Sequence, residues 1–160
     1  MTILIDITQQ TLFLKNLNNQ TIIQYPISTA KNGLGEKKGS YQTPRGHHII
    51  CEKIGADLPI FTVFRARKPT GEIFSAELEK QFPDRDWILS RILWLSGTEV
   101  GVNYGDDVDT KERFIYIHGT NDEKHIGTPN SHGCIRMLNV DVIDLFDRVD
   151  LNTSVFIVTH

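Results

Sequence analysis

The stretch from residue 117 to residue 137 combines histidine, glycine and cysteine in an order that suits thiol chemistry. Ile117-His118-Gly119-Thr120 is followed, after eleven residues, by His132-Gly133-Cys134-Ile135-Arg136-Met137. A cysteine attacks as its thiolate, so a nucleophilic Cys134 needs a base to ionise it, and His118 is a residue of the right type. A glycine before the cysteine permits a sharp turn and lets a carbonyl approach the backbone amides, which can form an oxyanion hole.

Two other interpretations of these residues stay open. A free cysteine is often only a small apolar residue that fills space in a core. Donor types that bind Zn²⁺ are also present, in His118, His125, His132 and Cys134. Their spacing matches no recognised zinc-finger pattern, and a thiolate bound to zinc would be a poor nucleophile.

The composition indicates an ordinary globular domain with no strong attraction to polyanions. The 160 residues carry 17 Lys+Arg against 20 Asp+Glu, a formal net charge of −3, and 39% of them are hydrophobic. This length fits one domain. The mildly acidic balance argues against nucleic acid or an anionic membrane as the main partner, and no apolar run approaches the ~20 residues of a membrane helix.

The N-terminus lacks the features of a secretory leader, which would place basic residues ahead of an apolar stretch. Met1 is followed by Thr2-Ile3-Leu4-Ile5-Asp6-Ile7, and no lysine or arginine occurs before Lys15. We therefore expect a cytoplasmic protein, or a periplasmic one if a leader has been removed. A reducing compartment predicts free thiols at Cys51 and Cys134.

Apolar periodicity predicts a mainly β fold with one or two helices. Apolar residues alternate in 3–7 and 12–14, as in strands with one buried face, and Asn18-Asn19 predicts a hairpin turn. The segment 87–95 is compatible with strand or helix. Further strands are expected at 61–64, 113–118 and 154–158, with helices at 76–80 after a Ser75 N-cap and at 140–149 after an Asn139 N-cap.

Both halves of the cysteine motif resemble the YkuD-type L,D-transpeptidase catalytic domain. The resemblance is carried by His118-Gly119-Thr120-Asn121, Ile126-Gly127 and Ser131–Met137, and by Tyr25–Ala30 and Thr43–Gly46 in the N-terminal half. It implies a single YkuD-like domain over residues 1–160, a β-sandwich or barrel-like fold. Residues 52–110 do not match the family core, and we expect an insertion there that flanks the substrate cleft.

The resemblance also implies roles for particular residues. Cys134 would be the nucleophile and His118 its general base, with the carbonyl of Gly119 orienting the far nitrogen of the imidazole. His132 would shape the site, and the amides around Gly133 would stabilise the oxyanion. The expected substrate-binding residues are Arg136, whose guanidinium can pair with a carboxylate, Ser131 and Arg45. No metal or cofactor is implied.

The implied substrates are peptidoglycan stem peptides or muropeptides, attacked at the L,D bond between a diamino acid and D-alanine. Because we expect a cytoplasmic protein, we expect an L,D-carboxypeptidase that trims tetrapeptides to tripeptides during peptidoglycan recycling. The alternative is an L,D-transpeptidase that forms cross-links or exchanges D-amino acids. A zinc-binding module or an inactive module that binds wall fragments are further alternatives. The sequence does not give the oligomeric state.

Overall fold

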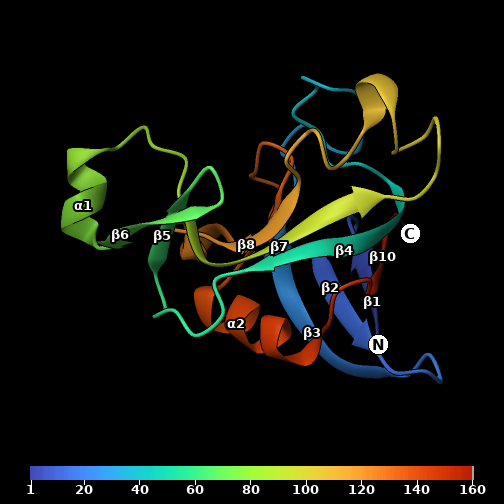
Figure 1. The fold of residues 1–160 in the computed structure, drawn as a ribbon, viewed down its shortest axis with the longest axis horizontal. Coiled ribbons are helices and arrows are strands. Elements are labelled where there is room, and N and C mark those ends of the chain that lie inside the picture. The colour runs from blue at the N-terminus through green and yellow to red at the C-terminus, as the bar shows by residue number, and fades with distance from the viewer. Residues whose placement is uncertain (160) are drawn as a thin grey trace.

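The strands join into one sheet that closes on itself. A computed structural model describes residues 1–159. In that range the strand order is β4-β10-β1-β2-β3-β9-β8-β7-β5-β6, and β4 also pairs with β7. This last pairing closes eight of the strands into a barrel and leaves the β5–β6 hairpin outside it, attached to β7 (Figure 1). The strands are β1 (Thr2–Asp6), β2 (Thr11–Lys15), β3 (Thr21–Ser28), β4 (Gly46–Ile54), β5 (Thr62–Arg65), β6 (Lys68–Ile73), β7 (Ile88–Gly97), β8 (Tyr116–Gly119), β9 (Ile135–Met137) and β10 (Ser154–Val158).

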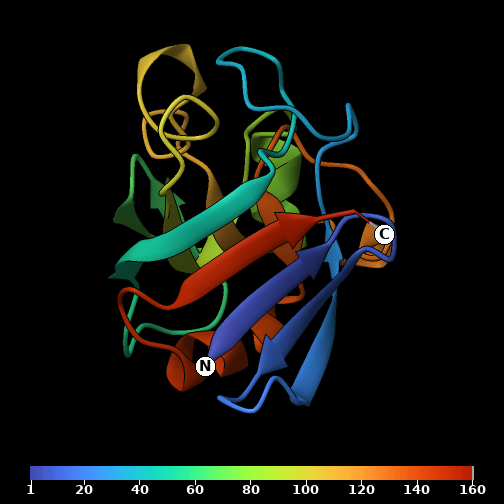
Figure 2. The same cartoon turned by 90° about the vertical axis from the view of Figure 1, so that its right-hand side faces the viewer.

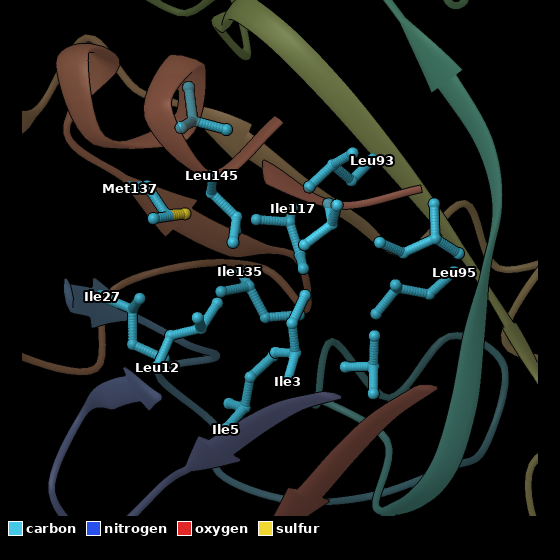
Figure 3. Close-up of a cluster of buried hydrophobic side chains, with 14 of the residues drawn as sticks. Ile3, Ile5, Leu12, Ile27, Leu93, Leu95, Ile117, Ile135, Met137 and Leu145 are labelled. Atoms are coloured by element: carbon cyan, nitrogen blue, oxygen red, sulfur yellow. The ribbon is translucent and has the colours of Figure 1, made fainter. Parts of the chain in front are cut away.

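Alternating side chains fill the interior of the barrel. Ile3 and Ile5 of β1 face Ile117 of β8 and Ile135 of β9 across the core, and all four are buried (Figure 3). Helix α2 (Asn139–Arg148) covers one side and inserts Leu145 into the same cluster. Burial of this continuous apolar cluster is the main force that holds the barrel together.

Several local predictions are confirmed. β2 and β3 pair as an antiparallel hairpin, and Asn19 has the positive φ of 60° that its turn requires. Helix α1 (Ala76–Gln81) follows Ser75, whose hydroxyl accepts a hydrogen bond from the amide of Leu78. The segment 87–95, left undecided by the sequence, is a strand from Ile88 onward, within β7. β10 has the predicted bounds and lies between β4 and β1 (Figure 2).

Two local predictions are wrong. The strand expected at 113–118 begins only at Tyr116, because residues 111–114 form a turn in which Phe114 has φ 56°. Asn139 is not the N-cap of the last helix but its first residue, after Leu138. Its side chain is turned into the protein, where buried polar partners outcompete the capping geometry.

The middle segment, 52–110, contributes both to the barrel and to a projection outside it. β7 is a barrel strand between β4 and β8, whereas β5, β6 and α1 form a lobe at one side (Figure 1). That this segment contains an insertion relative to the family stays a prediction. No helix within residues 1–159 has the length and apolar character needed to span a membrane.

The long loops gather at one end of the barrel. Figure 2 shows the loops at 31–45 and 98–113 on the same side, and a backbone hydrogen bond from Lys38 to Asp107 (2.6 Å) joins them. Arg113 adds bonds from its guanidinium to the carbonyls of Gly35 (3.2 Å) and Gln42 (2.6 Å).

Candidate active site

The parallel pairing of β8 with β9 brings the two halves of the cysteine motif together. Its register aligns Ile117 with Ile135 and His118 with Arg136. Because side chains alternate along a strand, the two isoleucines enter the core while His118 and Arg136 share the opposite face. Cys134 directly precedes β9, two residues before Arg136, and this pairing brings it to the same cavity as His118.

Cys134 and His118 line the same cavity, which has a volume of about 290 Å³. Three arginines also line it: Arg67, Arg113 and Arg136. None of the three forms an ion pair with a carboxylate of the described residues. One carboxylate, that of Asp86, also lines the cavity. The three guanidinium groups outnumber it, so the surroundings of the cysteine carry a net positive charge that suits an anionic ligand.

His118 is held in one tautomer by the peptide that follows it. The ring is buried, and its Nδ1 lies 2.7 Å from the carbonyl oxygen of Gly119. Because a carbonyl only accepts hydrogen bonds, Nδ1 carries the proton and Nε2 keeps its lone pair. Burial lowers the pKa of His118, an effect that the Gly119 carbonyl opposes. The imidazole is thus neutral at pH 7 and able to accept a proton, and the predicted contact with Gly119 is present.

Asn139 fixes the peptide that orients His118. Its amide nitrogen donates to the carbonyl of Thr120 (2.8 Å), and its Oδ1 accepts from the hydroxyl of Ser90 (2.6 Å). A Cβ at Gly119 would lie 2.3 Å from Asn139 Oδ1 and 2.7 Å from the carbonyl oxygen of Leu89. Gly119 is therefore required for close packing, and the buried asparagine holds the backbone on which the imidazole depends.

The thiol of Cys134 is protonated in the resting protein. Its Sγ donates to the carbonyl of Phe114 (3.4 Å) and accepts from the amide of Tyr116 (3.4 Å). Burial raises the pKa of Cys134 to about 12, against the lowering effect of the Tyr116 amide and of Arg136. Desolvation outweighs the nearby cations, so the resting pair is a neutral thiol and a neutral imidazole rather than the ionised thiolate expected from the sequence.

The turn before Cys134 is closed by its own polar groups. The hydroxyl of Ser131 donates to the carbonyl of Cys134 (2.6 Å) and accepts from the amide of Gly133 (3.2 Å), while Thr43 donates to the carbonyl of Gly133 (2.9 Å). Gly133 has φ 133°, which a side chain rarely adopts. Ser131 and the Gly133 amide are thus used to hold the turn. Among the described residues the amide of Cys134 has no acceptor, so it is the group left to stabilise an oxyanion.

The remaining predicted site residues are only partly brought together. Arg45 does not line the cavity; it is exposed and forms an ion pair with Glu36 (3.1 Å). His132 is exposed at the rim, where its ring packs edge-on against Tyr41 at 6.1 Å between centroids. It borders both the Cys134 cavity and a larger hollow of about 670 Å³, and Arg136 does the same.

The four residues that could have formed a zinc site are separated. His125 lines only the larger hollow, and its Nδ1 is 2.6 Å from a carboxylate oxygen of Asp122. Within residues 1–159 no three or more His, Cys, Asp and Glu side chains are arranged to hold a metal ion.

The sequence of the whole barrel fits one known family. The sequence model of the L,D-transpeptidase catalytic domain, YkuD, matches residues 1–157. The chain belongs to this family. The region matched includes the lobe as well as the cysteine motif, and the activity of the family is directed at peptidoglycan.

Curated relatives of this L,D-transpeptidase domain match over shorter stretches. YqjB of Bacillus subtilis (strain 168), which bears the name L,D-transpeptidase, is 44% identical over 52 residues, or 32% of this chain and 30% of YqjB. YbiS of Escherichia coli (strain K12), with the same family name, is 46% identical over 43 residues, or 27% of this chain and 14% of YbiS. Less than a third of either relative is therefore matched.

Solved structures share the fold of this L,D-transpeptidase domain. The L,D-transpeptidase of Xylanimonas cellulosilytica has a TM-score of 0.57 at 17% identity, covering 98% of this chain and 59% of that chain. LdtMt1, solved in complex with imipenem, has a TM-score of 0.58 at 18% identity, with 98% and 58% covered. Bd1075 of Bdellovibrio bacteriovorus has a TM-score of 0.58 at 20% identity, with 99% and 47% covered. Identities this low show the fold alone.

Four residues at this site were not predicted from the sequence. Arg67, Asp86 and Arg113 line the cavity, and Asn139 supports it from behind. The first three lie outside the motif and reach the cavity only through the tertiary fold. Asn139 lies two residues after the motif, and its polar side chain at the start of an otherwise apolar helix face was a signal for it.

Proposed function

We propose that the protein is a cysteine-dependent L,D-carboxypeptidase that releases D-alanine from the tetrapeptide stem of soluble muropeptides. One observation carries this proposal: a cysteine and a neutral histidine fixed by Gly119 share a small cavity with three arginines that have no carboxylate partner. A free C-terminal carboxylate is the anion that an exopeptidase must recognise, and guanidinium groups are suited to bind it.

The first step transfers a proton and an acyl group. As Cys134 Sγ attacks the carbonyl of the diamino acid, its proton passes to Nε2 of His118, the nitrogen left free by the contact with Gly119. The amide of Cys134 stabilises the developing oxyanion. The C–N bond then breaks, the leaving amine of D-alanine takes the proton from Nε2, and the acyl group remains on sulfur as a thioester.

The second step returns the enzyme to its resting state. Water attacks the thioester carbonyl and gives a proton to Nε2 of His118. The C–S bond breaks, the tripeptide leaves as a carboxylic acid, and sulfur recovers the proton from the imidazole. Because both groups rest in neutral forms, each step begins and ends without a net charge on the pair.

The alternative is that an amine accepts the acyl group, which gives a cross-link or an exchanged D-amino acid. The larger hollow beside His132 and Arg136 offers space for an acceptor next to the thioester. Incubation with a diaminopimelate-containing tetrapeptide, with and without excess of a second D-amino acid, distinguishes the two. We expect tripeptide plus D-alanine in both cases, and none with Cys134→Ala. Predominant exchange products would favour the transferase.

We extend the proposal to a cytoplasmic location, with a periplasmic location as the alternative. Both cysteines are free thiols, as is usual in a reducing compartment. Fractionation of the source cells, followed by immunodetection of the protein, tests this directly. Recovery with the periplasmic or wall fraction would overturn it.

A further inference from the structure

The tip of the β5–β6 hairpin has an unusual conformation that places an arginine in the active-site cavity. Arg65 pairs with Lys68, so the turn consists of only Ala66 and Arg67, with φ values of 48° and 65°. Two-residue hairpin turns with two positive φ angles normally contain Asn-Gly or similar pairs, since other side chains are disfavoured there. Arg67 thus occupies the position at which glycine would be favoured.

The guanidinium of Arg67 is held by aromatic rings. Its Cζ lies 5.0 Å from the ring centroid of Trp94 and 4.9 Å from that of Phe114, and Nη1 donates to the hydroxyl of Tyr116 (3.1 Å). These contacts restrain the plane of the guanidinium, which lowers the entropy lost when a planar anion binds to it.

Arg67 keeps more unused donors than Arg113 and, unlike Arg136, lines only the smaller cavity. Arg113 donates to Gly35, Ser40 and Gln42 and so ties the loop at 31–45 to the site. Arg136 donates to the carbonyl of Asn130 and lines both hollows. In the described part of the chain, the guanidinium of Arg67 makes one hydrogen bond, to the neutral hydroxyl of Tyr116, which leaves its other donors free for a ligand. Within residues 1–159 it has no carboxylate partner.

We propose that Arg67 binds the free C-terminal carboxylate of the D-residue that leaves, and thereby makes the enzyme specific for the end of the stem peptide. The inference rests on the proposed function. With the terminal residue in the smaller cavity and its carboxylate on Arg67, the preceding carbonyl lies toward Cys134, and the rest of the stem extends toward the larger hollow beyond His132 and Arg136.

Binding measurements on the non-reactive Cys134→Ala protein test the inference without turnover. The probe is a diaminopimelate-containing tetrapeptide that ends in D-alanine, prepared as the free acid and as the C-terminal amide, and titrated by calorimetry. We expect the acid to bind about 10- to 100-fold more tightly than the amide, as for a charge-assisted pair. Adding Arg67→Gly should abolish this preference, whereas adding Arg65→Ala, an equal loss of charge at an exposed hairpin position, should retain it.

Glycine at position 67 suits a φ of 65°, so the hairpin should fold at least as well in the variant, and a thermal melt checks this. The inference would be overturned if the protein that contains Arg67 bound acid and amide equally or bound neither. It would also be overturned if Arg67→Gly weakened the binding of both peptides equally. Turnover by the wild-type protein is read separately. If the acid preference depends on Arg67 but no D-alanine is released, the proposed function fails and this binding site stands.

Discussion

Alkylation of Cys134 by iodoacetamide at neutral pH should be slow and nearly independent of His118. The resting thiol is protonated because burial raises the pKa of Cys134 to about 12, while burial also lowers the pKa of His118. A preformed thiolate–imidazolium pair would behave in the opposite way, since the histidine would then hold the cysteine in its reactive form.

The size of the effect follows from the thiolate fraction. At pH 7 a thiol of pKa about 12 is ionised to roughly one part in 10⁵, against about 3% for an ordinary cysteine of pKa about 8.5. A more basic thiolate is intrinsically more nucleophilic, and a Brønsted slope of 0.4–0.5 restores about 25- to 55-fold of this roughly 3,000-fold deficit. Cys134 should therefore react about 50 to 120 times more slowly than a free thiol.

The assay is intact-mass measurement of carbamidomethylation in the Cys51→Ser variant, in which Cys134 is the remaining thiol. An unstructured peptide with a single cysteine of ordinary pKa, about 8.5, serves as the free-thiol reference between pH 6 and pH 9. His118→Gln should leave the alkylation rate at pH 7 within a few-fold while abolishing release of D-alanine. Three results together would refute the neutral pair: the alkylation rate of Cys134 equals or exceeds that of the reference, it does not change from pH 6 to pH 8, and it falls sharply in His118→Gln.

Three further outcomes are expected. Asn139→Ala should lower the free energy of unfolding by roughly 2–4 kcal/mol in urea titrations, because the Ser90 hydroxyl and Thr120 carbonyl lose their buried partner, and should reduce D-alanine release more than peptide binding. Gly119→Ala should lower the free energy of unfolding by about 1–3 kcal/mol in the same titrations, because its Cβ would lie 2.3 Å from Asn139 Oδ1. In a double-mutant cycle with Asn139→Ala, the double variant should lose less stability than the sum of the two single losses. Burial lowers the pKa of His48 to about 4. As the pH falls from 6.5 towards 4 the unfolded chain therefore binds the proton first, and up to about 3 kcal/mol of stability is lost. His48→Gln should make the free energy of unfolding from urea titrations less dependent on pH over this range, and an unchanged slope would contradict the assignment.

Much of the barrel follows from alternation in the sequence, because each strand has one face in the core. Ile117 and Ile135 are buried, and the same alternation leaves His118 and Arg136 on the other face. The alternation in the motif therefore predicts that His118 and Arg136 face away from the core. Alternation says nothing of which strands are neighbours, and the parallel β8–β9 pairing was supplied by the tertiary fold.

Predictions failed where a side chain has a stronger partner far away in sequence. Phe114 and Ile115 continue an apolar alternation, yet the chain turns there while the Arg113 guanidinium binds carbonyls of the loop at 31–45. Asn139 has the right type for an N-cap, but its amide is bound to Thr120 and Ser90. Arg67 belongs to a hairpin almost fifty residues before Tyr116, the hydroxyl to which it donates. No local pattern encodes such pairs.

Binding of the substrate also bears on when the thiol ionises. Arg136 and Arg113 lower the pKa of Cys134, although burial raises it further. A substrate carboxylate in the same cavity would offset part of the positive charge and would stabilise the thiolate less. Ionisation of Cys134 before the attack is thus least favourable when the peptide is bound. The transfer of its proton to His118 must therefore accompany the attack on the carbonyl. A thiol that stays protonated until the attack is also poorly oxidised. The desolvation that slows alkylation of Cys134 by iodoacetamide should therefore slow its oxidation by hydrogen peroxide as well. The sulfur then reacts chiefly with a correctly placed peptide.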